Sequence, residues 1–226
     1  MRLFAVAIAL FTLSSSASWA QTPAGPYKLE KTVKVGGAGG FDYVNADVAG
    51  RRVYFARTGQ MPHIGVYNLD TFAPVGDVTT TNAHGAVVDP KSGNAFASSK
   101  PLTMFDSKTL KVIKTIEVQG NPDGMYYDPW DRRVYVLSHA APHITVINAK
   151  DGSIIGTLDI GGMPEQAVSD GKGHLYVDVE DKENIAVIDT KKLMVTAHYD
   201  LKGKGGTCAG LAMDVKNRIQ IGRAHV

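Results

Sequence analysis

Four ionisable side chains recur at nearly equal intervals along this chain and are the strongest candidates for chemistry. They are Asp42, His84, Asp123 and Glu165, separated by 42, 39 and 42 positions. Brought together, three carboxylates and a neutral imidazole would suit a divalent metal ion. The oxygens favour Ca²⁺, Mg²⁺ or Mn²⁺, and the imidazole admits Zn²⁺ or Fe²⁺. Without a metal, converging carboxylates would raise one another's pKa, and one of them could serve as a general acid.

The spacing arises because each of the four residues lies five positions before an aspartate that anchors a repeated block. These anchors are Asp47, Asp89, Asp128, Asp170 and Asp214. In the third block, Met125–Asp128 and Arg133–Leu137 are short segments of period two on either side of a turn. Two further strand segments complete each block. Four antiparallel strands repeated about every 42 residues are typical of the blades of a β-propeller, so we predict an all-β propeller.

The first strand of each blade lines the central channel of a propeller, so equal offsets should bring the four side chains to one axis. The fifth block has Ala209 at this position. A second group ends the next strand on the same face, and its candidates are Thr58, Lys100, His139 and Glu180. The alternative is a wet channel lined by solvated polar groups, because no recognised metal-ligand spacing supports the site. The anchoring aspartates themselves are expected to cap turns.

The repeats also predict the domain organisation. We expect blades at residues 40–80, 82–119, 121–161 and 163–203, followed by a partial blade at 207–219. Residues 28–36 resemble the fourth strand of a blade, at 113–120. They are expected to complete the last blade of a ring, because an open ring exposes unpaired backbone groups.

Two strings, V-V-D-P-K-S-G-N-A-F and Y-Y-D-P-W-D-R-R-V-Y-V-L-S, resemble the YVTN-type β-propeller repeat family, the YncE-like exported bacterial proteins. The resemblance covers Tyr27 to about Arg218 and implies a seven-bladed parent, but it implies little chemistry. The family's name-giving string is replaced by Tyr135–Ser138 and Tyr176–Val179. Four and a half blocks would then form an open arc of a truncated protein. Residues 220–226 read like a translated sequencing adapter and are expected to be an artefactual tail.

The N-terminus predicts export to the periplasm or beyond the cell. Arg2, an apolar run over 3–13 and small residues around position 20 fit a signal peptide at 1–20, which leaves a partial propeller at 21–219. No later stretch is apolar enough to span a membrane. Cys208 is the only cysteine, so no internal disulfide is possible. The net charge is +2 with scattered basic residues, which disfavours a nucleic-acid partner.

These features favour an exported binding or scaffold module for a protein or a small ligand, rather than an enzyme. One alternative is a metal-dependent hydrolase of the propeller lactonase kind, with the first group of residues as metal ligands. Another is an accessory protein of a redox or haem-handling system, in which His84 and His139 would hold the cofactor. The last alternative depends on fold analogy alone.

Overall fold

The computed structural model describes residues 28–36, 39–203, 208–217 and 219–224. The chain divides into two units after Val35. The expected signal peptide and the last two residues of the expected tail lie outside the described residues. Residues 28–36, which were predicted to complete the last blade of a ring, form no strand in this structure. A strand needs backbone hydrogen bonds to a neighbouring strand, and residues 28–36 belong to none of the described sheets.

Among the described residues of the second unit, eighteen strands build five antiparallel sheets. The first sheet comprises β1 (Gly40–Asp47), β2 (Arg52–Thr58), β3 (His63–Asn68) and β4 (Pro74–Thr79). The second comprises β5 (Ala86–Val88), β6 (Asn94–Ala97), β7 (Leu102–Asp106) and β8 (Val112–Ile116). The third comprises β9 (Pro122–Asp128), β10 (Arg133–Ser138), β11 (Ile144–Asn148) and β12 (Ile154–Leu158). The fourth comprises β13 (Pro164–Ser169), β14 (His174–Val179), β15 (Asn184–Asp189) and β16 (Met194–Asp200). The fifth pairs β17 (Cys208–Asp214) with β18 (Ile219–Ala224).

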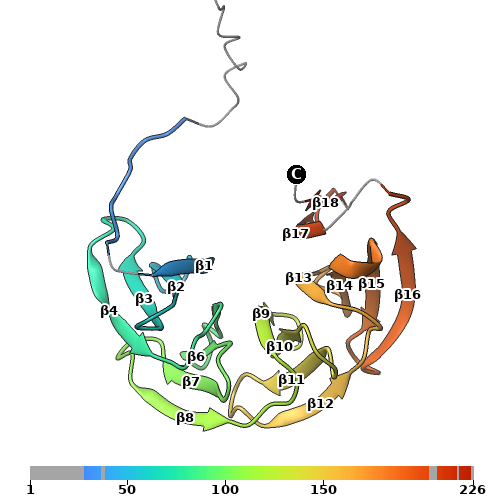
Figure 1. The fold of residues 1–226 in the computed structure, drawn as a ribbon, viewed down its shortest axis with the longest axis horizontal. Coiled ribbons are helices and arrows are strands. Elements are labelled where there is room, and N and C mark those ends of the chain that lie inside the picture. Colours follow the sequence, from blue (N-terminus) through green and yellow to red (C-terminus); the bar gives the residue numbers. More distant parts are fainter. Residues whose placement is uncertain (1–27, 37–38, 204–207, 218, 225–226) are drawn as a thin grey trace, which may run out of the picture. The chain divides into compact units, whose positions relative to one another are not determined.

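Each four-stranded sheet keeps its strands in sequence order, and every neighbouring pair is antiparallel. The sheets of this unit follow one another around an open arc, with β1, β9, β13 and β17 on its inner side (Figure 1), and β5 packs against both β1 and β9. This confirms the predicted all-β fold of repeated four-stranded sheets. The only helical element among the described residues is the 3₁₀ turn η1 (Glu180–Lys182). No helix in the described part of the chain is long and apolar enough to cross a membrane.

The anchoring aspartates cap the turn between the first two strands of each sheet, as the sequence predicts. Asp89 Oδ1 accepts a hydrogen bond from the backbone N–H of Lys91 at 3.0 Å, and Asp128 Oδ1 accepts one from Trp130 at 3.0 Å. The other three anchors accept equivalent bonds from the backbone two or three residues ahead. These short-range bonds favour the same turn in every repeat, and equal turns end the inner strands at equivalent positions.

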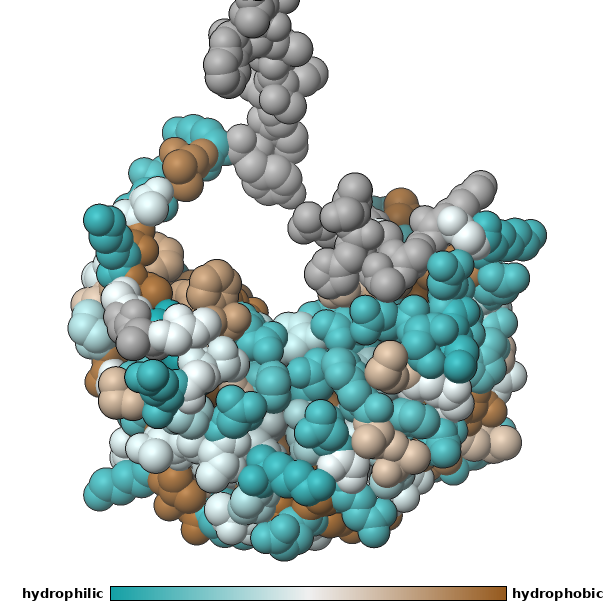
Figure 2. Space-filling view, in the orientation of Figure 1, coloured by the Kyte–Doolittle hydropathy of each residue, from teal (hydrophilic) through white to brown (hydrophobic). Residues whose placement is uncertain are grey.

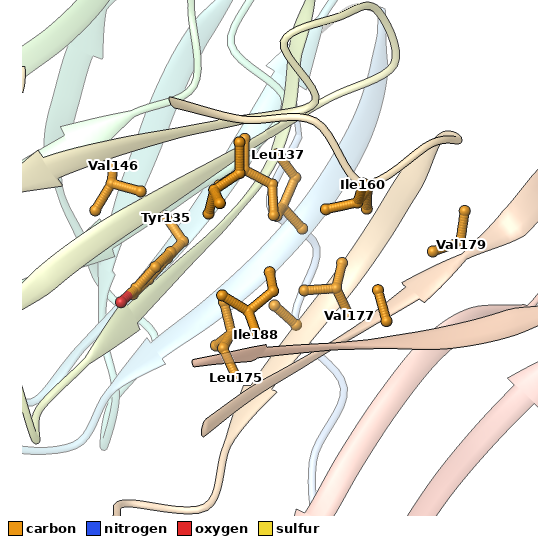
Figure 3. Close-up of a cluster of buried hydrophobic side chains, with 12 residues drawn as sticks. Tyr135, Leu137, Val146, Ile160, Leu175, Val177, Val179 and Ile188 are labelled. Atoms are coloured by element: carbon orange, nitrogen blue, oxygen red, sulfur yellow. The ribbon is translucent and has the colours of Figure 1, made fainter. Parts of the chain in front are cut away.

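The hydrophobic core lies between neighbouring sheets rather than within one sheet. Between the third and fourth sheets, Leu137 and Val146 pack with Leu175, Val177 and Ile188 (Figure 3), and all five are at most 1% exposed. Each such side chain stabilises the fold by about 1.5–3 kcal/mol when fully buried. Similar clusters join the other neighbouring sheets. The outermost strands instead leave apolar side chains exposed, and apolar groups lie along the rim in Figure 2.

Candidate functional site

The four side chains that the sequence singles out come together on the inner strands. His84 Nδ1 lies 2.8 Å from Asp42 Oδ2 and 3.2 Å from Asp123 Oδ1. His139 Nε2 lies 3.4 Å from Asp123 Oδ2 and 3.1 Å from Glu165 Oε2. The result is a continuous row of alternating carboxylates and imidazoles contributed by four sheets. We call these five residues the inner cluster.

The second predicted group joins this cluster only through His139. Lys100 turns to the backbone instead, and its ammonium donates a 2.5 Å hydrogen bond to the carbonyl of Gly120. Glu180 begins the 3₁₀ turn η1, and none of its described contacts reaches the inner cluster. Lys100 and Glu180 therefore lie outside the inner cluster, although Lys100 lines a hollow together with His84. The N–H of Glu180 donates to the Met163 carbonyl as the N–H of His139 donates to that of Asn121, so equal offsets give these two residues equivalent backbone positions.

β-bulges on three inner strands place the acidic residues of the cluster. In β1, Asp42 and Tyr43 together lie opposite one residue of β2. The pairs Asp123–Gly124 in β9 and Glu165–Gln166 in β13 have the same two-to-one register. A bulge breaks the alternation of side chains and turns the local strand. The period-two pattern would send Gln166 away from the channel, yet Glu165 and Gln166 line the same cavity.

Tyr43 belongs to the site although it was not among the predicted residues. Its hydroxyl donates a 2.7 Å hydrogen bond to Glu165 Oε1 and also lies 3.1 Å from the Glu165 carbonyl oxygen. The second and third sheets have Gly85 and Gly124 at the position corresponding to Tyr43. A Cβ atom on Gly85 would lie 3.4 Å from Tyr43 Cβ, and one on Gly124 would lie 3.6 Å from the Tyr43 hydroxyl oxygen. The glycines leave room for the tyrosine. In the sequence, one large residue at a repeat position where two other blades have glycine was the signal that could have identified Tyr43.

The electrostatics of the cluster reflect its partial burial. Burial raises the pKa of the Asp123 carboxyl, the nearby Glu165 charge raises it further, and the two imidazoles oppose this shift. Burial also raises the pKa of the Tyr43 hydroxyl, and its hydrogen bond to Glu165 acts in the same direction. Tyr43 therefore stays protonated and acts as a hydrogen-bond donor. Uncharged donors of this kind orient a carboxylate without neutralising it.

A second ionisable group lies just behind the cluster. Asp178 of β14 is fully buried and sits opposite the bulge of β13, where its Oδ1 accepts a 2.5 Å hydrogen bond from the backbone N–H of Gln166. Burial raises the pKa of Asp178 to about 7, and the negative charge of Glu165 adds to this effect. Its position indicates a structural role, because it satisfies the backbone donor that the bulge removes from the sheet.

A cavity of about 610 Å³ adjoins the cluster at Tyr43 and Glu165. Its remaining wall is mostly apolar and includes Val87, Leu137 and Val168. A cavity of this size can enclose a small molecule, and polar groups at one end of an apolar wall can orient it.

Comparisons with known proteins address the fold. No protein-family model matches the chain, and no curated protein matches it. Among solved structures, it is similar to the β-propeller domain of Cps50 (Swd1) from Myceliophteria thermophila, with 12% identity and a TM-score of 0.68 over 87% of this chain. The fold is a β-propeller. Hydrazine synthase from Kuenenia stuttgartiensis is also similar, with 16% identity and a TM-score of 0.69 over 83% of this chain. The propeller described here spans 65% and 56% of the lengths of those two chains.

Proposed function

We propose that this propeller is a binding module that holds a divalent metal ion in the inner cluster and presents it to a small ligand. The observation that carries the proposal is a row contributed by four blades, in which each of two imidazoles lies 2.8–3.4 Å from two of three carboxylates. Metal sites need such converging donors, and like-charged carboxylates gain most from a cation placed between them.

The donor set favours certain ions. Two carboxylates with one imidazole suit Zn²⁺, Mn²⁺ or Fe²⁺, whereas Ca²⁺ and Mg²⁺ prefer oxygen donors alone. The haem macrocycle occupies four positions around its iron, so the protein supplies only one or two ligands, such as His, Met, Cys or Tyr. Here one nitrogen of each imidazole faces two carboxylates, an arrangement in which all three groups could share a small divalent ion, and this supports a divalent ion over the haem-handling alternative.

The adjoining cavity supports a small-molecule ligand. Its apolar wall would contact the body of the ligand, and a metal ion beside Glu165 would attract an oxygen-bearing or anionic group. Tyr43 would take part by orienting the Glu165 carboxylate. A flat protein-binding surface would need neither a hollow of this size nor an ion at its end.

Metal titration of the full chain tests the proposal. Calorimetry with Zn²⁺ after removal of bound metal should show saturable binding, and Asp123→Asn should weaken it at least about tenfold. The matched control is Asp159→Asn. The Asp159 carboxylate lies 2.6 Å from His143 Nδ1, outside the inner cluster, and is far more exposed than that of Asp123. Equal Zn²⁺ affinity in the wild-type protein and Asp123→Asn would contradict the proposal.

A metal-dependent hydrolase is the second candidate, and the open cavity beside the cluster favours it. A metal ion lowers the pKa of a bound water and makes it a nucleophile near neutral pH. The cavity offers space for a substrate next to that water. Release of product from simple lactones, esters or phosphoesters by the Zn²⁺- or Mn²⁺-loaded protein, lost in Asp123→Asn, would favour the hydrolase over the binding module.

We also propose that the chain is an exported member of the YVTN-type, YncE-like family. Its support is the signal-peptide pattern of residues 1–20 and the repeat strings around Asp89 and Asp128. Expression with the natural N-terminus in a bacterium tests the export. Mass spectrometry should find a mature chain that begins at Gln21 in the periplasm or the medium. An uncleaved chain in the cytoplasm would contradict it.

A further inference from the structure

The inner cluster contains two sets of metal ligands rather than one. Asp42, His84 and Asp123 form the first set, and Asp123, His139 and Glu165 form the second. Within each set, the donor atoms lie within 4.8 Å of one another. Each set supplies one imidazole and two carboxylates, so each alone could hold an ion of the same class.

Asp123 belongs to both sets and directs a different oxygen to each. Its Oδ1 lies 3.2 Å from His84 Nδ1, and its Oδ2 lies 3.4 Å from His139 Nε2. A carboxylate that bridges two metal ions gives one oxygen to each of them, and such ions lie about 3.5–4 Å apart. We propose, resting on the metal site proposed above, that this propeller holds a pair of divalent ions bridged by the Asp123 carboxylate.

The fold supports the bridging position of this residue. Asp123 lies on the third blade between ligands from the first two blades and a ligand from the fourth. Its side chain is 12% exposed, the least of the three carboxylates, against 34% for Asp42 and 18% for Glu165. The bulge of β9 places it there. The least accessible carboxylate therefore stands between the two imidazoles, whereas the outer two stand at the ends of the row.

The charge of the cluster accommodates two ions as well as one. Three carboxylates converge here, and within the described part of the chain their ion pairs involve only the two histidines. Bound to metal, the three carboxylates carry three negative charges. One divalent ion would leave a net negative charge on the cluster, whereas two would leave one positive charge. A positive pair beside the cavity would attract an anionic oxygen group, such as a carboxylate or a phosphate, which could contact both ions.

Stoichiometry and magnetic coupling test the pair on the full chain. Titration with Mn²⁺ or Zn²⁺ should saturate at two ions per chain. Electron paramagnetic resonance of the Mn²⁺ form should show the spectrum of two exchange-coupled ions rather than that of isolated Mn²⁺. Saturation at one ion per chain would overturn the pair but leave the single-metal function intact. Absence of binding would overturn both proposals.

Variants of the two outer carboxylates then separate the sites. Asp42→Asn should remove the ion of the first set and Glu165→Gln that of the second, so each should bind one uncoupled Mn²⁺ ion. Asp123→Asn should weaken both ions at least about tenfold, and Asp159→Asn should still bind a coupled pair. A coupled pair retained in both Asp42→Asn and Glu165→Gln would overturn the assignment of the ligands. Circular dichroism and thermal melting of each variant identify a misfolded chain. If a variant is misfolded, the electron paramagnetic resonance spectrum of the Mn²⁺-loaded wild-type protein still decides the proposal.

Discussion

The hydroxyl of Tyr43 in the first blade donates a 2.7 Å hydrogen bond to Glu165 in the fourth blade, 122 positions further along the chain. The tyrosine thereby crosses the second and third blades, where Gly85 and Gly124 leave space for it. This contact holds one oxygen of Glu165 and leaves the other facing His139. It also places a large aromatic ring at the end of the apolar cavity. The shape of the candidate site therefore depends on one side chain that reaches across the inner strands.

Replacing Tyr43 with phenylalanine should weaken metal binding without unfolding the protein. The variant keeps the ring but loses the donor that orients Glu165, and losses of this kind cost roughly 10–100-fold in affinity. Calorimetry with Zn²⁺ measures the effect. Tyr199→Phe is the matched control, because Tyr199 is exposed on the outer strand β16. Unchanged Zn²⁺ affinity in Tyr43→Phe would show that the contact plays no part in binding.

Gly124→Ala should destabilise the propeller. A Cβ atom at this position would lie 2.6 Å from the carbonyl oxygen of Glu165, a backbone atom that cannot easily move. Overpacking of this kind costs about 1–3 kcal/mol in the free energy of unfolding, measured by denaturant titration. Gly156→Ala is the control, because its Cβ would make an ordinary 3.4 Å contact with Leu193. A Gly124→Ala protein as stable as the wild type would mean that the inner strands can move apart.

Asp89→Asn should lower the free energy of unfolding by about 3 kcal/mol. Asp89 is fully buried, and burial by itself raises its pKa. Hydrogen bonds from Arg132, Ser92 and Tyr127 outweigh this effect and bring the pKa to about 2. The carboxylate therefore adds stability above about pH 4, and this contribution is lost as the pH falls toward 2.

The control for this change is Asp70→Asn, which removes an exposed ion pair with Arg51. Exposed pairs contribute little to stability, because water and salt screen them. Urea titrations at pH 7 and pH 3 should show a large loss for Asp89→Asn that shrinks in acid, and a small loss for Asp70→Asn. Equal losses in the two variants at pH 7 would contradict the role of Asp89.

Asp178→Asn should remove a pH dependence of stability. The pKa of Asp178 is raised to about 7, so between about pH 4 and 7 the folded chain keeps a proton that the unfolded chain releases. The stabilising contribution is complete below about pH 4 and declines as the pH rises to 7. An amide can still accept the bond from Gln166 and carries no charge. We expect a gain of up to about 4 kcal/mol at pH 8 and little change at pH 4.

Melting temperatures across this pH range check the prediction. A wild-type chain whose stability does not fall between pH 4 and 7 relative to Asp178→Asn would contradict it. Asp200→Asn is a suitable reference, because Asp200 lies exposed at the end of β16 and should have a small effect at every pH.

The repeated aspartates and the period-two segments determined the fold and its turns from sequence alone. Both signals are local, since a turn and a strand depend on residues a few positions apart. The same repeat brought Asp42, His84, Asp123 and Glu165 to one place, because equal offsets in equal blades give equal positions. Local information of this kind identified all five cluster residues, although it placed His139 in a separate group.

Only the tertiary structure decided how these side chains meet. The bulges at Asp42, Asp123 and Glu165 depend on register with the next strand, which the hydrophobic pattern does not encode. Equal offsets gave Glu180 the same backbone position as His139 but did not bring its side chain into the cluster, and residues 28–36 pair with none of the described sheets. Tyr43 entered the site because two distant glycines lie beneath it. Contacts across many residues depend on the packing of whole blades, and no local pattern in the chain determines that packing.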